Sequence, residues 1–486
     1  MSRSTVEPWL CLCLGFLLVV PILGCQADGA GGDEDAAQAP TFYVSPTGSN
    51  DNPGTRELPW ATPGFGSKQL RPGNTLVILP GEYLMTHYYD DMVTPEVSGT
   101  AEAWITIRGE AAAPPIIRGR GSLMAAVDIG GRSYIRLENL VLTGHIDEPY
   151  TGGLREGIDA GGSSGTGVSH VVLENIEVHR VEECAINFGG NISDVRMERL
   201  RLHHTGGTGI SAPGAEGGNG WERVLLTDSY VGYAGHFWQG EDRLSEWDRP
   251  DGIGMEPSAG PLEIANCLFA HNRGDGVDSK CRQTYVHDTI IANNYADSLK
   301  FWGDGSRAEN VLIYGDGDGE ADNGPWASIV VHAEQPGSFE FVNVTVDDSA
   351  TRSNYPVYMQ YGETVPVTVT LRNCIIAHGS NVIYMEDSVT LDARHCLFAR
   401  TGDAGRPVIH ANGRDYLPAE VGLLGAGNLS AEPQFVSRAW GTEGDYHLRP
   451  GSPAVDAGTA TGAPAADLEG TARPQGAGVD MGAYER

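Results

Sequence analysis

A short motif recurs through the middle of this chain, and it constrains the fold more than any other feature. Each copy is a polar pair followed by a short alternating apolar segment, as in "ANCLFAH" at 265–271, "HDTIIAN" at 287–293 and "ENVLIYG" at 309–315. These copies follow at a constant spacing, and "RNCIIAH" at 372–378 and "RHCLFAR" at 394–400 repeat that spacing. Elsewhere the copies lie further apart, as loop insertions would cause. Self-similarity at such a period predicts a solenoid.

The type of solenoid follows from the residues between the copies. The apolar segments are short and β-branched, they are broken by Gly, Asn and Asp, and no helical pattern lies between them. The 66 glycines also argue against a helical protein. The sequence therefore predicts an all-β parallel β-helix rather than a leucine-rich repeat, with coils stacked about 4.8 Å apart around one continuous core.

Both ends of the repeat region resemble segments of secreted bacterial right-handed parallel β-helix proteins. The opening is "FYVSPTGSNDNPGTRELPWATP" at 42–63 with "VILPGEY" at 77–83, and the closing segments are "GSPAVDAG" at 451–458 and "GVDMGAYER" at 478–486. A solenoid needs such caps because its terminal coils expose open strand edges. We expect an N-terminal cap and first coils over 41–130, the β-helix with its groove over 131–400, and a C-terminal cap over 401–486.

The N-terminus has the pattern of a targeting segment. Arg3 precedes an apolar run from Trp9 to Gly24, which is short for a membrane span and typical of a signal peptide. The run ends in "ILGC", which resembles the lipobox that leaves Cys25 as a lipidated first residue; an ordinary signal peptide cut nearby is the alternative. We expect a signal peptide over 1–24, a flexible tether over 25–40, and a protein anchored in the bacterial cell envelope, at the outer membrane, or secreted.

The charge of the chain restricts its partners. A formal net charge of −32 disfavours nucleic acid, which needs a basic surface, and makes an acidic substrate awkward unless cations mediate the contact. Five cysteines lie outside both the signal peptide and the tether, without a CxxC metal spacing, and a disulfide framework is not indicated. Of these, Cys267, Cys374 and Cys396 share one position of the repeat, which favours small core-lining side chains.

Stacking the coils brings acidic residues together. Residues one coil apart lie above one another, so Asp251, Asp275 and Asp297 form one column. In a neighbouring column Lys300 stacks on Asp278, and earlier coils continue these columns through Asp159 and Ser211. Stacked carboxylates repel one another unless a cation sits among them, and hard oxygen ligands without His or Cys suit Ca²⁺. The alternative is that these Asp-Gly pairs are only turn residues.

A second lysine lies close by. Lys280 stacks over Glu256 and beneath Trp302, which predicts a surface ion pair with Glu256. Lys280, Trp302 and Trp247 are also the candidates for substrate contacts, because aromatic rings can stack on sugar rings. An equal alternative is that the tryptophans, Trp238 included, only pack inserted loops.

Three successive coils, "DGIG", "NRGDGVDSK" and "NNYADSLKFWG", resemble those of polysaccharide lyase family 9. The resemblance implies that Asp251, Asp275 and Asp278 bind Ca²⁺ and that Lys300 is the catalytic base. This sequence departs from the family at Gly274, where another calcium-binding aspartate is common. Asp297 is then a candidate fourth ligand.

The chemistry of such a site agrees with the resemblance. β-Elimination from a uronate requires removal of the proton next to a carboxylate, and Ca²⁺ that bridges enzyme and substrate carboxylates stabilises the resulting charge. We therefore expect a monomeric, calcium-dependent lyase of a pectate-like acidic polysaccharide. The "GHG" and "RIK"-like segments of polygalacturonases are absent from the sequence. A non-catalytic surface β-helix that binds glycan or calcium is the alternative function.

Overall fold

The computed structural model describes residues 39–121, 123–144, 152–162, 164–212, 219–236, 249–316, 327–348, 355–360, 362–403, 405–439 and 442–486. These ranges lie in one compact unit, Ala39–Arg486. The described residues do not include the predicted signal peptide, the predicted lipid site Cys25, nearly all of the predicted tether, Trp238 or Trp247. Within the described ranges, no helix is long and apolar enough to cross a membrane.

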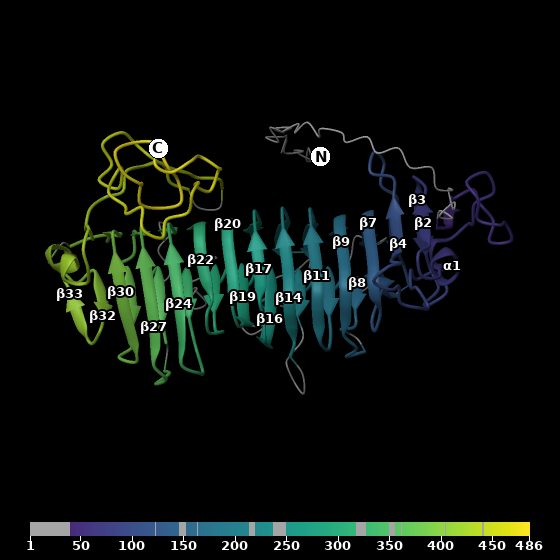
Figure 1. Ribbon diagram of the computed structural model, residues 1–486, viewed down its shortest axis with the longest axis horizontal. Helices are drawn as coiled ribbons and strands as arrows, with labels where there is room; N and C mark the ends of the chain where they lie inside the picture. The colour runs from purple at the N-terminus through teal and green to yellow at the C-terminus, as the bar shows by residue number, and fades with distance from the viewer. Residues whose placement is uncertain are drawn as a thin grey trace, which may run out of the picture. The chain divides into compact units, whose positions relative to one another are not determined.

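The described unit is nearly all β-structure, in long parallel sheets (Figure 1). Its strands form three ladders, of which the first two belong to one 21-stranded sheet and the third is a 12-stranded sheet. Except at the C-terminal end of the third ladder, successive strands of a ladder pair in parallel one coil apart, for example Leu262 with Thr284 and Tyr285 with Arg307. This is the parallel β-helix that the repeat predicts.

Each ladder takes one strand from most coils. The first ladder consists of β1 (Thr41–Val44), β2 (Thr75–Ile78), β4 (Ile105–Gly109), β7 (Ser133–Gly144), β9 (Val168–His179), β11 (Ile192–Glu198), β14 (Trp221–Thr227), β17 (Leu262–Ala265), β20 (Thr284–Ala292), β22 (Arg307–Tyr314), β24 (Gly337–Val342), β27 (Val367–Arg372) and β30 (Val389–Arg394). The second consists of β3 (Glu82–Met85), β5 (Ile116–Gly119), the later parts of β7, β9, β20 and β22, and β12 (Arg201–Thr205), β15 (Tyr230–Ala234), β18 (Leu268–Ala270), β25 (Thr345–Asp347), β28 (Ile375–Ala377) and β31 (Leu397–Ala399). The third consists of β6 (Leu123–Asp128), β8 (Leu154–Ala160), β10 (Ile186–Phe188), β13 (Ile210–Ala212), β16 (Ile253–Ser258), β19 (Val277–Cys281), β21 (Leu299–Phe301), β23 (Ile329–Val331), β26 (Val357–Met359), β29 (Ile383–Met385), β32 (Ile409–Ala411) and β33 (Arg414–Tyr416).

The second polar residue of each repeat copy forms the corner between the first two ladders. Asn266, Asp288, Asn310, Asn343 and Asn373 all have φ between 48° and 53°, the left-handed conformation. Asn and Asp tolerate that conformation better than most residues do. Their side chains also link the coils: Asn310 Nδ2 donates to Asp288 Oδ1 at 3.0 Å, and Asn373 Nδ2 donates to Asn343 Oδ1 at 3.1 Å. The polar pair of the sequence repeat therefore marks this corner of each coil.

Next to the corner, small side chains fill the core. Cys267, Cys374 and Cys396 are buried with exposed fractions of 4%, 1% and 0%, as the repeat predicts. These three and Cys184 and Cys281 are free thiols. The core cluster runs from Val44 to Val421 without a break, so the coils share one apolar interior.

The C-terminal part of the chain divides into two pieces. The first closes the last coil: β33 pairs antiparallel with β32, the 3₁₀ helix η2 (Pro418–Leu423) follows, and Leu397 bridges to Leu429. The second piece carries the hairpin β34 (Phe435–Ser437) and β35 (Asp445–Leu448) and packs against the corners of earlier coils (Figure 1). There Asn343 Nδ2 donates to the carbonyl oxygens of Asp480 and Gly482. The predicted cap thus also covers a flank of the stack.

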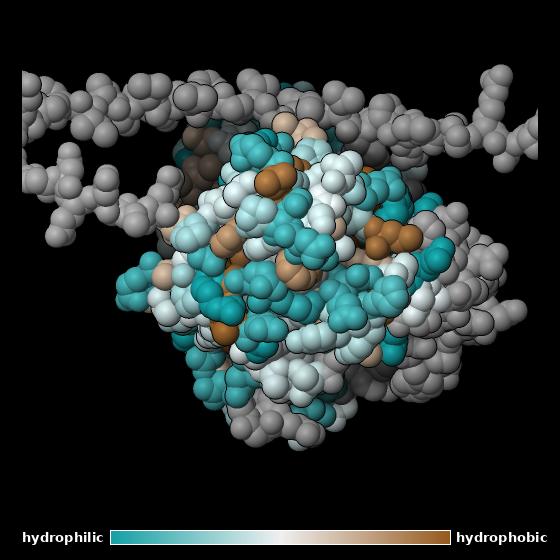
Figure 2. Space-filling model, turned by 90° about the vertical axis from the view of Figure 1, so that its right-hand side faces the viewer, coloured by the Kyte–Doolittle hydropathy of each residue, from teal (hydrophilic) through white to brown (hydrophobic). Residues whose placement is uncertain are grey.

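The N-terminal end carries the helix α1 (Pro63–Lys68), which begins at the side-chain cap Thr62. Figure 2 views the molecule from this end, where hydrophilic and intermediate surface prevails and hydrophobic surface is confined to scattered spots. Such a surface disfavours the addition of a strand from another sheet to the first coil.

Candidate active site

The acidic column predicted from the sequence is present. Asp251 and Asp275 lie just before β16 and β19, and Asp297 lies just before β21. Asp251 Oδ1 accepts the backbone N–H of Asp275 at 2.7 Å, Asp275 Oδ1 accepts that of Asp297 at 3.0 Å, and Asp297 Oδ1 accepts that of Ala327 at 3.0 Å. Each carboxylate therefore fixes the backbone of the next coil, which explains why the aspartates repeat in register.

The neighbouring column is also as predicted. Asp278 pairs with Lys300 across β19 and β21, and Gly254 pairs with Asp278 across β16 and β19. On earlier coils Asp159 and Ser211 continue this column. Because alternate residues of a strand point to the same face, Asp278 and Lys300 lie on the outer face of the third ladder.

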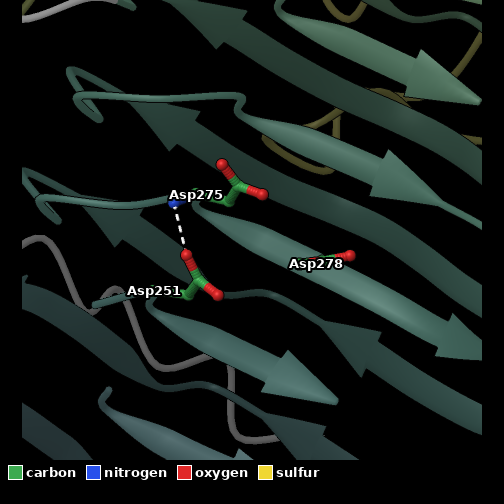
Figure 3. Close-up of side chains that lie close together, drawn as sticks. All are labelled: Asp251, Asp275 and Asp278. Atoms are coloured by element: carbon green, nitrogen blue, oxygen red, sulfur yellow. Dashed lines mark hydrogen bonds between the residues drawn. The ribbon is translucent and has the colours of Figure 1, made fainter. Parts of the chain in front are cut away.

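Three of the carboxylates form a compact group. One oxygen each of Asp251, Asp275 and Asp278 lies within 4.8 Å of the others, and Figure 3 shows the three side chains on adjacent coils. Asp297 lies outside this group: its Oδ1 accepts from Ala327 and its Oδ2 lies 2.9 Å from Lys300 Nζ. Three of the four predicted ligands therefore lie together, and the fourth, Asp297, pairs with Lys300 instead.

Burial makes this group electrostatically costly. It raises the pKa of Asp251 well above the ordinary value, and repulsion from Asp275 and Asp278 adds to the effect. Burial likewise raises the pKa of Asp275 to about 7, although Lys300 opposes the shift, and it raises the pKa of Asp278. A bound cation would remove this cost, since it neutralises the charges without adding protons.

Lys300 is the positive charge that the structure places against these carboxylates. Its Nζ lies 2.9 Å from Asp275 Oδ2 and 2.9 Å from Asp297 Oδ2. Burial lowers the pKa of Lys300, but Asp297, Asp275 and Asp278 outweigh burial and raise it. These contacts with the three carboxylates favour the ammonium form of Lys300.

Lysine is rare in this chain, and this rarity is a sequence signal that points to Lys300. Of the 32 basic residues only Lys68, Lys280 and Lys300 are lysines, and two of the three lie one coil apart on the same ladder. Arginine cannot be deprotonated in a protein and lysine can. The use of lysine here therefore agrees with a role in proton transfer.

Trp302 holds the third carboxylate. Its Nε1 donates to Asp278 Oδ1 at 2.8 Å, while Lys280 Nζ lies 5.4 Å from its ring centroid and the His332 ring lies 4.4 Å from it. Lys280 in turn donates to Glu256 at 2.9 Å, as predicted. The ring is thus flanked by the coils before and after it, which suits an orienting role for Trp302 better than a sugar platform. No sequence signal points to His332.

A pocket of about 600 Å³ adjoins Trp302. Its lining includes Lys280, Arg282, Trp302, Asp304 and Glu334. Sequence reasoning missed Arg282, because its position in a two-residue turn carries no repeat signal. Glu156 was missed too: it is buried in an earlier coil, burial raises its pKa to about 8, and its Oε2 has no hydrogen-bond partner.

Comparison with known proteins gives structural neighbours only. No family model matches the chain, and no curated protein matches it. Pectate lyase Pel9A is similar with a TM-score of 0.46 and 14% identity, over 93% of this chain and 98% of that one. The alginate lyase of Paenibacillus sp. str. FPU-7 has a TM-score of 0.39 and 14% identity, over 76% and 99%. The A-module of the Azotobacter vinelandii mannuronan C-5 epimerase AlgE4 has a TM-score of 0.47 and 14% identity, over 66% and 87%. The parallel β-helix expected from the sequence is shown by the strand ladders of the structure itself.

Proposed function

We propose that this protein is a calcium-dependent polysaccharide lyase that cleaves a uronate-containing polymer by β-elimination, with Lys300 as the base. The observation that carries the proposal is the grouping of Asp251, Asp275 and Asp278 beside Lys300 on an outer strand face. We also expect the coils to wind with a right hand, the usual hand of parallel strand connections.

The donor set fits Ca²⁺. The group offers only carboxylate oxygens, and Asp251 Oδ2 and Asp278 Oδ2 are not used by the hydrogen bonds that fix these side chains. Hard oxygen ligands suit Ca²⁺ and Mg²⁺, and a flexible carboxylate set favours Ca²⁺. When bound, the ion would neutralise the buried charges and attract the carboxylate of an acidic sugar.

Lys300 would remove the proton next to the sugar carboxylate. The C–H electron pair then forms the new C=C bond, the bond to the glycosidic oxygen breaks, and water protonates the leaving oxygen. Asp275 and Asp297 hold the Nζ in place, but they also keep it protonated. The amine becomes a usable base once the charges of these carboxylates are offset.

The test is a panel of uronate polymers, assayed with Ca²⁺ and with a chelator, for the ultraviolet absorbance of the unsaturated product. We expect calcium-dependent cleavage by the wild type and none by Lys300→Ala or Lys300→Arg, because a guanidinium does not deprotonate. Circular dichroism of both variants should match the wild type. Near-wild-type turnover by Lys300→Arg would contradict the mechanism. Calcium uptake without cleavage of any polymer would favour the binding β-helix instead.

A further inference from the structure

The pocket beside Trp302 lies among turns of unequal length. The third ladder connects to the first by Arg282 and Gln283 alone between β19 and β20. The next two connections are longer, with five residues each, 302–306 and 332–336. The short turn leaves a hollow that the longer turns border, with Arg282 in its lining.

This hollow adjoins the carboxylate group through Trp302 and Lys280. Trp302 lines the pocket and also donates to Asp278 with its Nε1. Lys280, on the same strand as Asp278, also lines the pocket. A polymer bound at the carboxylates would therefore meet the pocket within about one sugar residue, since adjacent coils are about 4.8 Å apart.

The charges in the pocket suit a sugar acid. Lys280 and Arg282 supply two cations in a chain of net charge −32. The side chain of Arg282 is 61% exposed, and its Nη2 approaches Asp304 Oδ2 only to 3.7 Å, too far for a hydrogen bond. Asp304 and Glu334 supply acceptors. A carboxylate pairs bidentately with a guanidinium, and sugar hydroxyl groups donate to carboxylates.

We propose that this pocket, which we call the Arg282 pocket, binds a second uronate residue of the polymer, with Arg282 as the group that recognises its carboxylate. Asp304 and Glu334 can accept hydrogen bonds from sugar hydroxyl groups, which a simple inorganic anion lacks, and a neutral sugar would offer no charge to the guanidinium. The pocket volume of about 600 Å³ is ample for one sugar residue. The inference rests on the proposed function, because it assumes the same acidic polymer.

Calorimetry with short oligomers tests the pocket separately from catalysis. The probes are trimers of galacturonate and of guluronate, each as the free acid and as the methyl ester, with Ca²⁺ present. All proteins carry Lys300→Ala, so that no probe is cleaved. We expect one acid to bind at least tenfold more tightly than its ester, and Arg282→Gln to weaken binding of that acid about tenfold while leaving the ester unchanged.

Arg307→Gln is the matched control. Arg307 lies over the Tyr285 ring at 3.7 Å, outside the pocket lining, and its loss should leave both affinities unchanged. Equal binding of acid and ester, an unchanged affinity in Arg282→Gln, or no binding of either acid would overturn the proposal. If Arg282→Gln loses acid affinity but the wild type produces no unsaturated product, the pocket stands and the lyase function fails. If the wild type cleaves a polymer and Arg282→Gln keeps the wild-type KM, the lyase function stands and the pocket proposal fails.

Discussion

The carboxylate of Asp251 fills a space that two glycines leave open. A Cβ at Gly274 would lie 2.2 Å from Asp251 Oδ1 and 2.4 Å from the carbonyl oxygen of Arg249, and a Cβ at Gly254 would lie 2.8 Å from Asp251 Oδ2. The aspartate that the family resemblance expects at position 274 therefore has no room here. Gly274 is a requirement of this arrangement of Asp251 rather than a simple loss of a ligand.

Gly274→Ala should consequently damage the cation site. The new methyl group must displace Asp251 or the backbone at 249–250, a close contact that costs roughly 1–3 kcal/mol. Calorimetric titration with Ca²⁺ should show affinity reduced by tenfold or more. Gly422→Ala is the matched control, because a Cβ there meets nothing within 4 Å. Unchanged calcium affinity in Gly274→Ala would remove Asp251 from the ligand set.

Trp302→Phe tests the orienting role of the indole. Phenylalanine keeps a ring between Lys280 and His332 but loses the hydrogen bond to Asp278 Oδ1. A hydrogen bond to a charged group contributes about 1.5–3 kcal/mol, so Ca²⁺ affinity should fall roughly tenfold or more. Thermal unfolding without calcium should change little. Trp104→Phe, at a ring that packs on Tyr134, should bind calcium like the wild type.

The sequence predicts the stacking of these residues better than their partners. Counting along the coils places Asp275 under Asp297 and Asp278 under Lys300, because the backbone ladder fixes that register. The register does not give the direction in which each side chain points. Lys300 reaches across to Asp275 and Asp297 in the other column rather than to Asp278, its strand partner, and this diverts Asp297 from the ligand group.

At the scale of elements, the second ladder carries a band of histidines. The His179 and His203 rings stack at 5.3 Å, and the His204 and Tyr233 rings stack at 4.6 Å. Burial lowers the pKa of His179 and His204 to about 4, and the charge of His203 adds to the shift. Burial and then Arg273 lower the pKa of His236 to about 4. His179 and His203 share one position of the repeat and pair in register, and His204 follows at the next position. The repeat therefore places these side chains one above the other but does not show that they are buried.

These histidines should make stability depend on pH. Between pH 6.5 and about 4 they are neutral in the folded state and protonated in the unfolded state, so the unfolded state binds more protons. Their contribution is fully present above pH 6.5 and is lost as the pH falls to about 4. His204→Phe keeps an aromatic ring against Tyr233 and removes one titration. Urea unfolding from pH 4 to 7 should show a shallower loss of stability for this variant than for the wild type. Parallel curves would contradict the assignment for His204.

At the scale of the whole molecule, the chain carries a net charge of −32 and is proposed to act on a polyanion. Long-range repulsion would slow their encounter at low ionic strength, and divalent cations would relieve it. The repeat was enough to predict the stacked parallel strands. It could not predict that the last segment packs on the flank, because Asn343 and its partners Asp480 and Gly482 lie far apart in the sequence and share no repeat position.

We also propose that the protein is held at a membrane face by lipid on Cys25, a residue outside the described ranges. The motif "ILGC" and the polar segment after it support this proposal. Cys25→Ser should move the protein from the membrane fraction to the soluble fraction, and metabolic labelling with a fatty acid should be lost. Identical fractionation of the wild type and Cys25→Ser would leave an ordinary signal peptide as the explanation. Gln26 rather than Asp after the cysteine favours the outer membrane.

The way the final segment packs sets an order of events during synthesis. Asn343 Nδ2 can donate to the carbonyl groups of Asp480 and Gly482 only after those residues have been made. Likewise, Thr345 Oγ1 can accept the N–H of Ala483 only after Ala483 has been made. Coils can stack as they emerge from the ribosome, each on the one before, yet these corners gain their partners only after residues 480–483 have been synthesised. A chain interrupted before residue 480 would present stacked coils with one flank bare. Proteases would thus have a means to tell a chain that carries this segment from a chain that lacks it.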